Sequence, residues 1–226
     1  MTEQWPGFFI SFEGLDGAGK STQVAALAAA LRAKHHEVLT VRPNATLLGE
    51  ILHSFVLQHQ RGPAVEPWAE ALLFNAERVQ LLGERVMPSL RRGAIVIADR
   101  YADSTLAYQG GGRGISIDAL MQLHREACDD IWPDLTFYLE VSAATAASRQ
   151  RDQQLPLDRI EGAPQGFHAA VLRTFNALAL AYPERIVRID GNRSAVEVSN
   201  DILDVVLQRL PTITGIPAAH SAPVTR

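Results

Sequence analysis

The sequence is poor in the features that mark secreted and membrane proteins. It has one cysteine, Cys128, among 226 residues, so these residues cannot form an internal disulfide. Cys128 follows a stretch with helical spacing, which favours a buried, unreactive thiol over a nucleophile. No apolar run is long enough to cross a bilayer, and the first residues lack the basic and apolar segments of a signal peptide. These absences predict a protein of the reducing cytoplasm without a membrane partner.

An excess of positive charge is also missing. The sequence has 21 Lys and Arg against 25 Asp and Glu, a formal net charge of -4. This balance argues against a nucleic-acid partner, because the phosphate backbone favours basic surfaces. At 47% hydrophobic and 20% charged residues, the composition is that of a globular protein with an ample core.

Internal repeats and domain linkers are absent, which predicts a single domain over residues 1–210. The stretch 211–226 is rich in small residues, contains proline and lacks periodicity. It is therefore expected to be a poorly ordered tail.

Apolar runs typical of strands alternate with stretches of helical spacing along the chain. The expected strands are 8–12, 37–42, 94–99, 135–141 and 186–190, and the expected helices are 22–34, 47–58, 68–92, 116–130, 143–151, 165–182 and 195–210. Pro88 is expected to bend or shorten the third helix, and Gly93 to end it. The alternation predicts an α/β fold with a five-stranded parallel sheet flanked by helices.

The most informative stretch follows the first strand. Residues 14–21, Gly-Leu-Asp-Gly-Ala-Gly-Lys-Ser, fit the phosphate-binding loop pattern, with a strand before them and a helix after them. The glycines let backbone N–H groups turn toward a polyphosphate, and the helix start adds further donors. Lys20 is placed to reach the β- and γ-phosphates, and the hydroxyl of Ser21 to bind Mg²⁺.

Other polar residues stand where strands end. The second strand is followed by Arg42, Pro43 and Asn44, and the third ends in Asp99 and Arg100. Ligands of open parallel sheets bind beyond the carboxyl ends of the strands. This convergence predicts one site for two phosphate-bearing ligands, with Arg100 and Arg42 holding the second.

Two further segments carry residues suited to a sugar or base. Residues 104–114 contain three consecutive glycines and are expected to form a loop of close approach, with polar side chains before them. On the third helix, Phe74 and Arg78 share a face and would suit a base, but their spacing alone favours Phe74 in the core and Arg78 on the surface.

A polar connection, 152–164, contains two prolines and is expected to be mobile. It and the helix before it hold Arg149, Arg151, Asp158, Arg159 and Glu161. Arginines here could close over a triphosphate, and a solvated charge cluster is the alternative.

Taken together, these motifs resemble the thymidylate kinase family across most of the chain. The matching segments are 12–23, Leu73-Phe74 with 78–80, 99–101, 104–105 with 107–114, 133–136 with 138–139, and 157–161. The Asp-Arg-Tyr segment and the Tyr-Gln-Gly-Gly-Gly-Arg-Gly segment are more specific than the phosphate loop alone. The resemblance implies a P-loop kinase fold with a mobile lid at about 149–164, and phosphorylation of dTMP to dTDP by ATP.

The resemblance also implies roles for individual residues. ATP would be held by Gly14, Leu15, Asp16, Gly17, Ala18, Gly19, Lys20, Ser21 and Thr22, and Mg²⁺ by Ser21 and Asp99. The acceptor nucleotide would be bound by Arg42, Phe74, Arg78, Arg100, Ser104, Thr105, Tyr108 and Gln109. Catalysis would depend on Lys20, Asp16, Arg100 and the lid arginines Arg149 and Arg151. The family is usually homodimeric.

The chain departs from the family pattern in two places. Residues 42–46 lack the glutamate and the two glycines that usually follow the second strand, and Asn75 and Glu77 replace an aromatic and a small residue. Two alternatives therefore stay open: a divergent kinase for another nucleotide, and a nucleotide-binding protein without turnover.

Overall fold

The computed structural model describes residues 5–58, 65–152 and 165–214. Its centre is a five-stranded, all-parallel sheet in the order β2-β3-β1-β4-β5. The strands are β1 (Phe8–Glu13), β2 (Val38–Val41), β3 (Ile95–Asp99), β4 (Leu135–Glu140) and β5 (Ile186–Asp190). All residues of β1 are buried, as expected of a central strand covered on both faces. The predicted five-stranded parallel sheet is confirmed.

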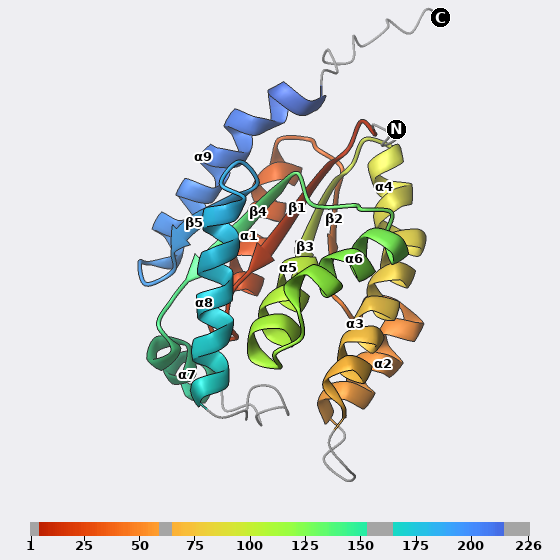
Figure 1. Cartoon of the computed structure of the whole chain (residues 1–226). Helices are drawn as coiled ribbons and strands as arrows, with labels where there is room; N and C mark the ends of the chain where they lie inside the picture. Colours follow the sequence, from red (N-terminus) through yellow and green to blue (C-terminus); the bar gives the residue numbers. More distant parts are fainter. Residues whose placement is uncertain (1–4, 59–64, 153–164, 215–226) are drawn as a thin grey trace, which may run out of the picture.

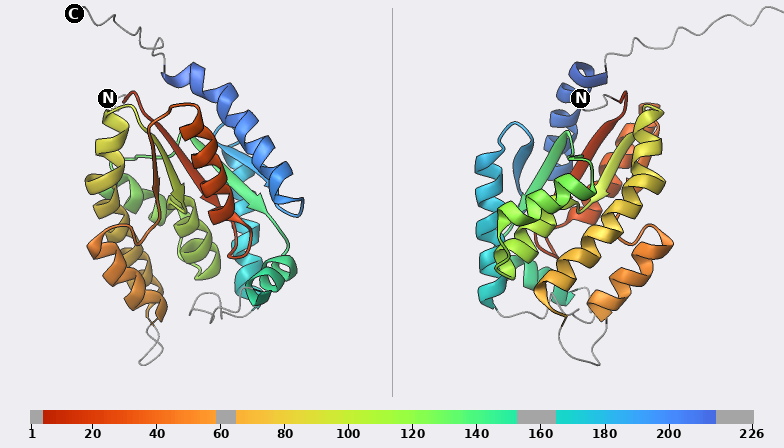
Figure 2. Two further views of the ribbon diagram at one scale, coloured as in Figure 1. Left: turned by 180° about the vertical axis from the view of Figure 1, so that it is seen from behind. Right: turned by 45° about the vertical axis from the view of Figure 1, so that its right-hand side comes forward.

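Helices cover both faces of this sheet. The described helices are α1 (Lys20–Ala33), α2 (Leu47–Gln58), α3 (Pro67–Leu81), α4 (Met87–Arg91), α5 (Ala102–Thr105), α6 (Ile117–Ala127), α7 (Ala143–Asp152), α8 (Gln165–Ala181) and α9 (Ala195–Thr214). Figure 2 shows α1 and α9 on one face, and Figure 1 shows α3, α6 and α8 on the other. At the carboxyl ends of the strands, α2 and α7 stand on opposite sides (Figure 1). The edge formed by the carboxyl ends of the strands therefore lies between α2 and α7.

The long third helix is interrupted near the predicted position. Between α3 and α4, the segment η1 (Leu82–Val86) forms a wider π-helical turn. Pro88 is the second residue of α4, and its ring leaves the backbone without an N–H donor, which explains why regular α-helical bonding stops here. Gly93 ends the helix with a φ of 86°, as expected.

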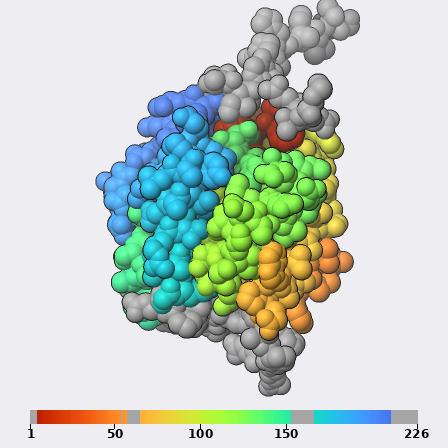
Figure 3. Space-filling view, in the orientation of Figure 1, coloured from red at the N-terminus to blue at the C-terminus, as the bar shows by residue number. Residues whose placement is uncertain are grey.

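The prediction of a loop at 104–114 is wrong. Residues 102–105 form α5, and η2 (Leu106–Gly112) continues it as a π-helical segment. The glycines are required by close approach and not by loop geometry: a Cβ at Gly111 would lie 2.1 Å from Oγ1 of Thr174 on α8, and a Cβ at Gly112 would lie 2.3 Å from the ring of Phe167. Figure 3 shows α8 and this green segment as neighbours on the surface. Among the four glycines at 110–112 and 114, only Gly114, which follows η2, has a positive φ.

Two helix ends also differ from expectation. The helix expected at 116–130 stops at Ala127, because Asp129 and Asp130 adopt positive φ values. The last helix runs to Thr214, so the first four residues of the predicted tail are helical. The remainder of that tail, and most of the predicted lid, lie outside the described residues. No helix in the described part of the chain has the length and apolar content needed to cross a membrane.

Candidate active site

The phosphate loop joins the buried strand β1 to α1. Gly14, Gly17 and Gly19 have φ values of 137°, 83° and 97°, which side chains with a Cβ rarely adopt. The side chains of Leu15 and Ala18 are only 3% exposed and pack into the core, which anchors the loop from below. The turn therefore follows from alternating glycines and apolar residues.

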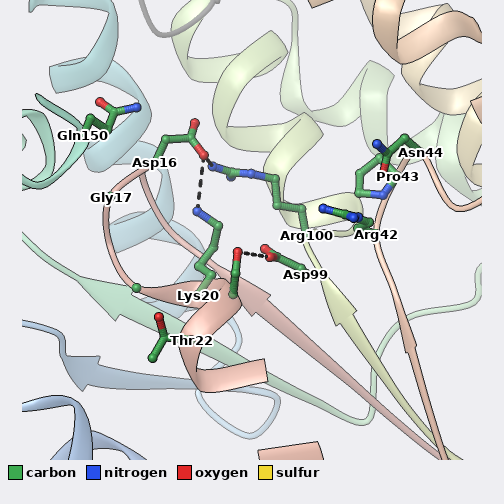
Figure 4. Close-up of a pocket in the computed structure, with 12 residues that line it drawn as sticks. Asp16, Gly17, Lys20, Thr22, Arg42, Pro43, Asn44, Asp99, Arg100 and Gln150 are labelled. Atoms are coloured by element: carbon green, nitrogen blue, oxygen red, sulfur yellow. Dashed lines mark hydrogen bonds and ion pairs between the residues drawn. The ribbon is translucent and has the colours of Figure 1, made fainter. Parts of the chain in front are cut away.

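A cavity of about 320 Å³ opens above this loop. Figure 4 shows Gln150 of α7 on one side and Arg42, Pro43 and Asn44 on the other, with Asp16, Lys20 and Arg100 between them. The remaining lining residues are Gly17, Gly19, Ser21, Thr22 and Asp99. The ends of β1, β2 and β3 thus meet at one cavity, as the sequence predicts.

Asp16 stands between the two cations of the cavity. The same carboxylate oxygen, Oδ1, lies 2.5 Å from Nη2 of Arg100 and 3.5 Å from Nζ of Lys20. Burial opposes ionisation of Asp16, but the charges of Arg100 and Lys20 outweigh it and hold its pKa below the usual range. Asp16 is therefore a carboxylate at neutral pH.

The phosphate-loop lysine is buried and bonded within its own loop. Its ammonium donates to the backbone carbonyls of Gly14, at 3.2 Å, and Leu15, at 2.8 Å. Burial, together with the nearby Arg100 charge, lowers the pKa of Lys20. An anion entering the cavity would offer this ammonium stronger, charge-assisted hydrogen bonds than the two carbonyls do.

Asp99 and Ser21 form the oxygen-rich part of the cavity. The hydroxyl of Ser21 donates to Oδ2 of Asp99 at 2.6 Å, and both residues line the cavity beside the phosphate loop. The described residues contain no group of three or more His, Cys, Asp or Glu side chains with metal-binding geometry. Mg²⁺ needs no such group at a phosphate site, because it takes one or two protein oxygens together with phosphate and water. The hydroxyl and the carboxylate fit this ion.

Arg100 lies in an unusual backbone conformation at the end of β3. Its φ of 76° is in the left-handed region. Its Nη1 donates to Gly14 O at 2.9 Å and to the hydroxyl of Ser104 at 3.1 Å, and its Nη2 donates to the hydroxyl of Tyr108 at 3.3 Å. Asp99 and Arg100 thus bond to different partners, and the alternative of a local solvated pair between them is wrong.

Arg78 is buried, and the expectation of a surface position from its spacing is wrong. Its side chain donates to Asn75 Oδ1 at 3.3 Å, to Tyr101 O at 3.4 Å and to Thr105 Oγ1 at 2.5 Å. Only 8% of Arg78 is exposed, because acceptors from α3 and from the 101–105 segment surround its guanidinium. Phe74 is half-buried and packs against the core, as its spacing predicts. Arg78 and Thr105 are therefore brought together.

Gln109 lies apart from the cavity in a buried polar cluster. Its Nε2 donates to Glu70 Oε1 at 2.9 Å, and the guanidinium of Arg113 holds both carboxylate oxygens of the same glutamate. Glu70 has no exposed surface. Its pairing with Gln109 and Arg113 joins α3 to η2.

The arginines of α7 do not line the cavity. Nη2 of Arg149 donates to the carbonyl of Gly191 at 2.9 Å, and Arg151 is exposed. Gln150, which lies between them in the sequence, lines the cavity instead. The predicted lid residues Asp158, Arg159 and Glu161 lie outside the described residues.

Sequence reasoning assigned no role to two residues at this edge of the sheet. Gln150 carries no motif, so only its place on α7 reveals it. Glu13 is fully buried at the end of β1 and accepts hydrogen bonds from Tyr101 and Ser104. A charged residue at the end of an otherwise apolar strand was the available signal.

A parallel sheet with a glycine-rich phosphate loop after its central strand defines a P-loop nucleotide-binding fold of the kinase type. Family comparison is more specific. The family model described as thymidylate kinase matches residues 12–202.

Individual relatives agree with this match. A thymidylate kinase of Thermomicrobium roseum is 44% identical over 185 residues, covering 81% of this chain and 87% of the relative. One of Deinococcus radiodurans is 43% identical over 206 residues, covering 90% and 98%. One of an Exiguobacterium species is 38% identical over 208 residues, covering 90% and 96%.

The chain belongs to the thymidylate kinase family. It is thus an enzyme of the nucleoside monophosphate kinase class, and the predictions of fold and enzyme class are confirmed. Family membership also supports the predicted ATP-dependent phosphorylation of dTMP.

Proposed function

We propose that this chain converts dTMP and ATP to dTDP and ADP by direct, in-line phosphoryl transfer at the cavity above the phosphate loop. An oxygen of the dTMP phosphate attacks the γ-phosphorus of ATP while the bond to the β–γ bridging oxygen breaks. ADP leaves with that electron pair. The observation that carries this proposal is the shared contact of Lys20 and Arg100 with one oxygen of Asp16. Two separate phosphate-binding groups thereby meet within one cavity.

On the ATP side, the phosphate loop and the first turn of α1 bind the polyphosphate. The amides of residues 14–22 turn toward the phosphates, and Lys20 exchanges its two carbonyl acceptors for phosphate oxygens. Because these groups are already in place, catalysis requires little reorganisation at the moment of transfer.

On the acceptor side, Arg100 binds the phosphate of dTMP, and Arg42 lines the same cavity. Arg78 and Thr105 contact the base edge, Phe74 stacks on the ring, and Tyr108 and Gln109 border the sugar and base. The hydrogen bond between Arg78 and Thr105 supports this arrangement, since it places both side chains at one point.

We further propose that Ser21 and Asp99 hold Mg²⁺. The ion supplies neutralisation of charge on the transferred group when it is bound. Asp16 orients Arg100 and Lys20 toward the same reacting phosphate, which supports its assignment as a catalytic residue.

The α7 arginines would act on closure. In this structure Arg149 is bonded to Gly191 and Arg151 is exposed, so a catalytic role requires a rearrangement around α7. Closure would also exclude water, which otherwise competes with dTMP for the phosphoryl group. The cytoplasmic location stays a prediction.

We also propose that the protein is a homodimer formed through α2 and α3. Leu47 and Ile51 share a face of α2 and are 75% and 58% exposed, and Trp68 and Leu72 on α3 are 47% and 51% exposed. The two helices pack against each other at one side of the molecule (Figure 1). Apolar side chains gathered on neighbouring helices mark an interface, and a second copy of the chain is the occupant proposed here.

The test of the reaction is ADP release over a panel of acceptors: dTMP, dUMP, dCMP, UMP and thymidine. We expect dTMP to give the highest kcat/KM. Preference for another acceptor would support the divergent kinase. Binding of ATP and dTMP without ADP formation would support a protein without turnover, which the altered segment 42–46 favours.

A further inference from the structure

Glu13 is a buried carboxyl group that the proposed reaction does not use. It ends β1, where its neighbour Phe12 is paired in register with Asp99, and none of its surface is exposed. An acid so placed is costly unless its oxygens accept hydrogen bonds. Both do: Oε1 accepts from the backbone N–H of Tyr101 at 2.7 Å, and Oε2 accepts from the hydroxyl of Ser104 at 2.5 Å.

The bond from Tyr101 to Glu13 combines with a bond to Phe12 to hold the backbone at Arg100. The N–H of Arg100 donates to Phe12 O at 3.0 Å, so two consecutive amides, Arg100 and Tyr101, are held by two consecutive residues of β1. The left-handed φ of Arg100 is unfavourable for a residue with a Cβ and persists only where its surroundings impose it. The carboxylate of Glu13 is one of the two groups that impose it.

The same carboxylate acts on the guanidinium through one intermediate. Nη1 of Arg100 donates to the hydroxyl oxygen of Ser104 at 3.1 Å, and the hydroxyl hydrogen of Ser104 is directed to Glu13. The order of this relay depends on an ionised Glu13. A protonated Oε2 would no longer accept a hydrogen bond from Ser104. The Ser104 hydroxyl would then no longer be held with its oxygen toward Arg100.

We infer that Glu13 is a positioning residue for the acceptor phosphate, holding Arg100 in its binding conformation through Tyr101 and Ser104. The inference rests on the proposed role of Arg100. It adds a residue that touches neither nucleotide, and it makes acceptor binding sensitive to the charge of Glu13.

The electrostatic surroundings place that sensitivity near neutral pH. Burial, followed by the charge of Asp103, raises the pKa of Glu13 to about 7, and the bonds from Ser104 and Tyr101 and the charge of Arg100 oppose this rise. Three other charged or titratable groups also interact with it: Lys20 of α1, Tyr108 of η2 and Arg185 before β5. Since the carboxylate form is the one that holds Arg100, acceptor binding weakens as pH falls through about 7.

The experiment compares wild type with Glu13→Gln between pH 5.5 and 8.5, and measures kcat, both KM values, and Kd for dTMP by calorimetry. At pH 8 we expect Glu13→Gln to raise the acceptor KM and Kd about tenfold, with the ATP KM unchanged. The ratio of the two kcat/KM values for dTMP should approach one toward pH 5.5. Titration of the dTMP phosphate cancels in this ratio. Glu126→Gln, an exposed acid on α6, is the control and should match wild type throughout.

A second variant tests the relay itself. Ser104→Ala should also raise the acceptor KM at pH 8, and the double variant should lose less than the product of the two single effects. If Glu13→Gln does not fold, Ser104→Ala alone decides the question, and an unchanged acceptor KM in that variant overturns the relay.

These experiments distinguish failure of the positioning role of Glu13 from failure of the proposed reaction. If wild type binds and phosphorylates dTMP while Glu13→Gln has the same acceptor KM and the same pH profile, the positioning role is overturned and the reaction stands. Equal losses for both nucleotides, or a ratio independent of pH, likewise overturn it. A wild-type chain that does not bind dTMP overturns the reaction and the inference together.

Discussion

In the proposed reaction, Lys20 and Arg100 share the compensation of phosphate charge. Each contacts the same carboxylate oxygen of Asp16, so both cations are paired with an anion in the absence of nucleotide. Asp16 is 35% exposed at its side chain and is retained as a carboxylate by its two cationic neighbours. Nucleotide phosphates entering the cavity would compete with this carboxylate for both cations.

Replacing Lys20 by alanine removes the ammonium proposed to bind the transferred phosphoryl group. We expect kcat to fall by about 10²–10³-fold, as for loss of one group that stabilises transition-state charge. The far-ultraviolet circular dichroism spectrum and the melting temperature should stay close to those of wild type. Lys34→Ala, at an exposed position after α1, is the control. A Lys20→Ala enzyme with a near-normal rate would contradict the role.

Arg100→Ala removes the guanidinium assigned to the acceptor phosphate. We expect the acceptor KM to rise about 10- to 100-fold, the range of one or two charge-assisted hydrogen bonds, with ATP binding retained. Steady-state kinetics with each nucleotide varied, together with ATP calorimetry, make the measurement. Arg125→Ala on the exposed face of α6 should leave all constants unchanged. Unaltered acceptor kinetics in Arg100→Ala would refute the assignment.

Among the elements, the helical segment 102–112 decides where the proposed acceptor-binding residues lie. It carries Ser104, Thr105, Tyr108 and Gln109, and it packs between α8 and α3. The packing is so close that the segment has no room for a side chain at Gly111: a Cβ there would come within 3.0 Å of the backbone oxygen of Ala170. The glycines thus place the site residues by letting two helices approach.

Gly111→Ala should therefore destabilise the fold by about 1–3 kcal/mol, since α8 has to move to admit the methyl group. Gly83→Ala is the matched control, because Gly83 is also helical and a Cβ there meets nothing within 4 Å. That substitution should be neutral or should stabilise by up to about 1 kcal/mol through helix propensity. Urea denaturation of both variants makes the comparison, and equal midpoints would contradict the packing argument.

At the scale of the whole molecule, Glu77, a buried acid on α3 near the start of α2, makes the free energy of unfolding depend on pH. Glu77 is 2% exposed, and burial raises its pKa to about 8, against the opposing charge of Arg78. The ordinary value is 4.5, so between about pH 4.5 and 8 the native state binds more protons than the unfolded state. The free energy of unfolding contributed by this group therefore falls as pH rises through that window.

Glu77→Gln removes this loss. We expect it to match wild type in stability near pH 4.5 and to exceed it by roughly 4 kcal/mol at pH 8. Thermal or urea unfolding across this range provides the measurement, with Glu126→Gln as the exposed control. Parallel stability curves for Glu77→Gln and wild type would contradict the raised pKa.

Assembly is also a property of the whole molecule. If α2 and α3 form the dimer interface, Ile51→Glu and Leu72→Glu should convert the protein to a monomer, because each would bury an unpaired charge. Sedimentation velocity measures the mass. Val196→Glu is the matched control, since Val196 is 70% exposed on α9, at the opposite face of the sheet (Figure 2). A wild-type monomer, or dimers in both variants, would exclude this interface.

What the sequence determined by itself is local or periodic. The phosphate loop follows from residues 14–21 alone, because glycine conformations and a helix start are set by neighbours along the chain. The five strands follow from apolar runs, and their parallel orientation follows from the helices that connect them. The meeting of Lys20, Asp99 and Arg100 followed in turn, since parallel strands end at one edge.

What only the tertiary structure decided involves partners distant in the sequence. The spacing of Arg78 predicts a surface position, yet Thr105, 27 residues later, helps to bury it. The glycines at 110–112 predict a loop from sequence, but the structure shows that they make room for α8. The sequence identifies Glu13 only as the end of a strand, and its hydrogen bonds with Tyr101 and Ser104 appear only in the structure. In each case burial and hydrogen bonding belong to a pair of segments, and the free energy that fixes the conformation arises only when the two are packed together.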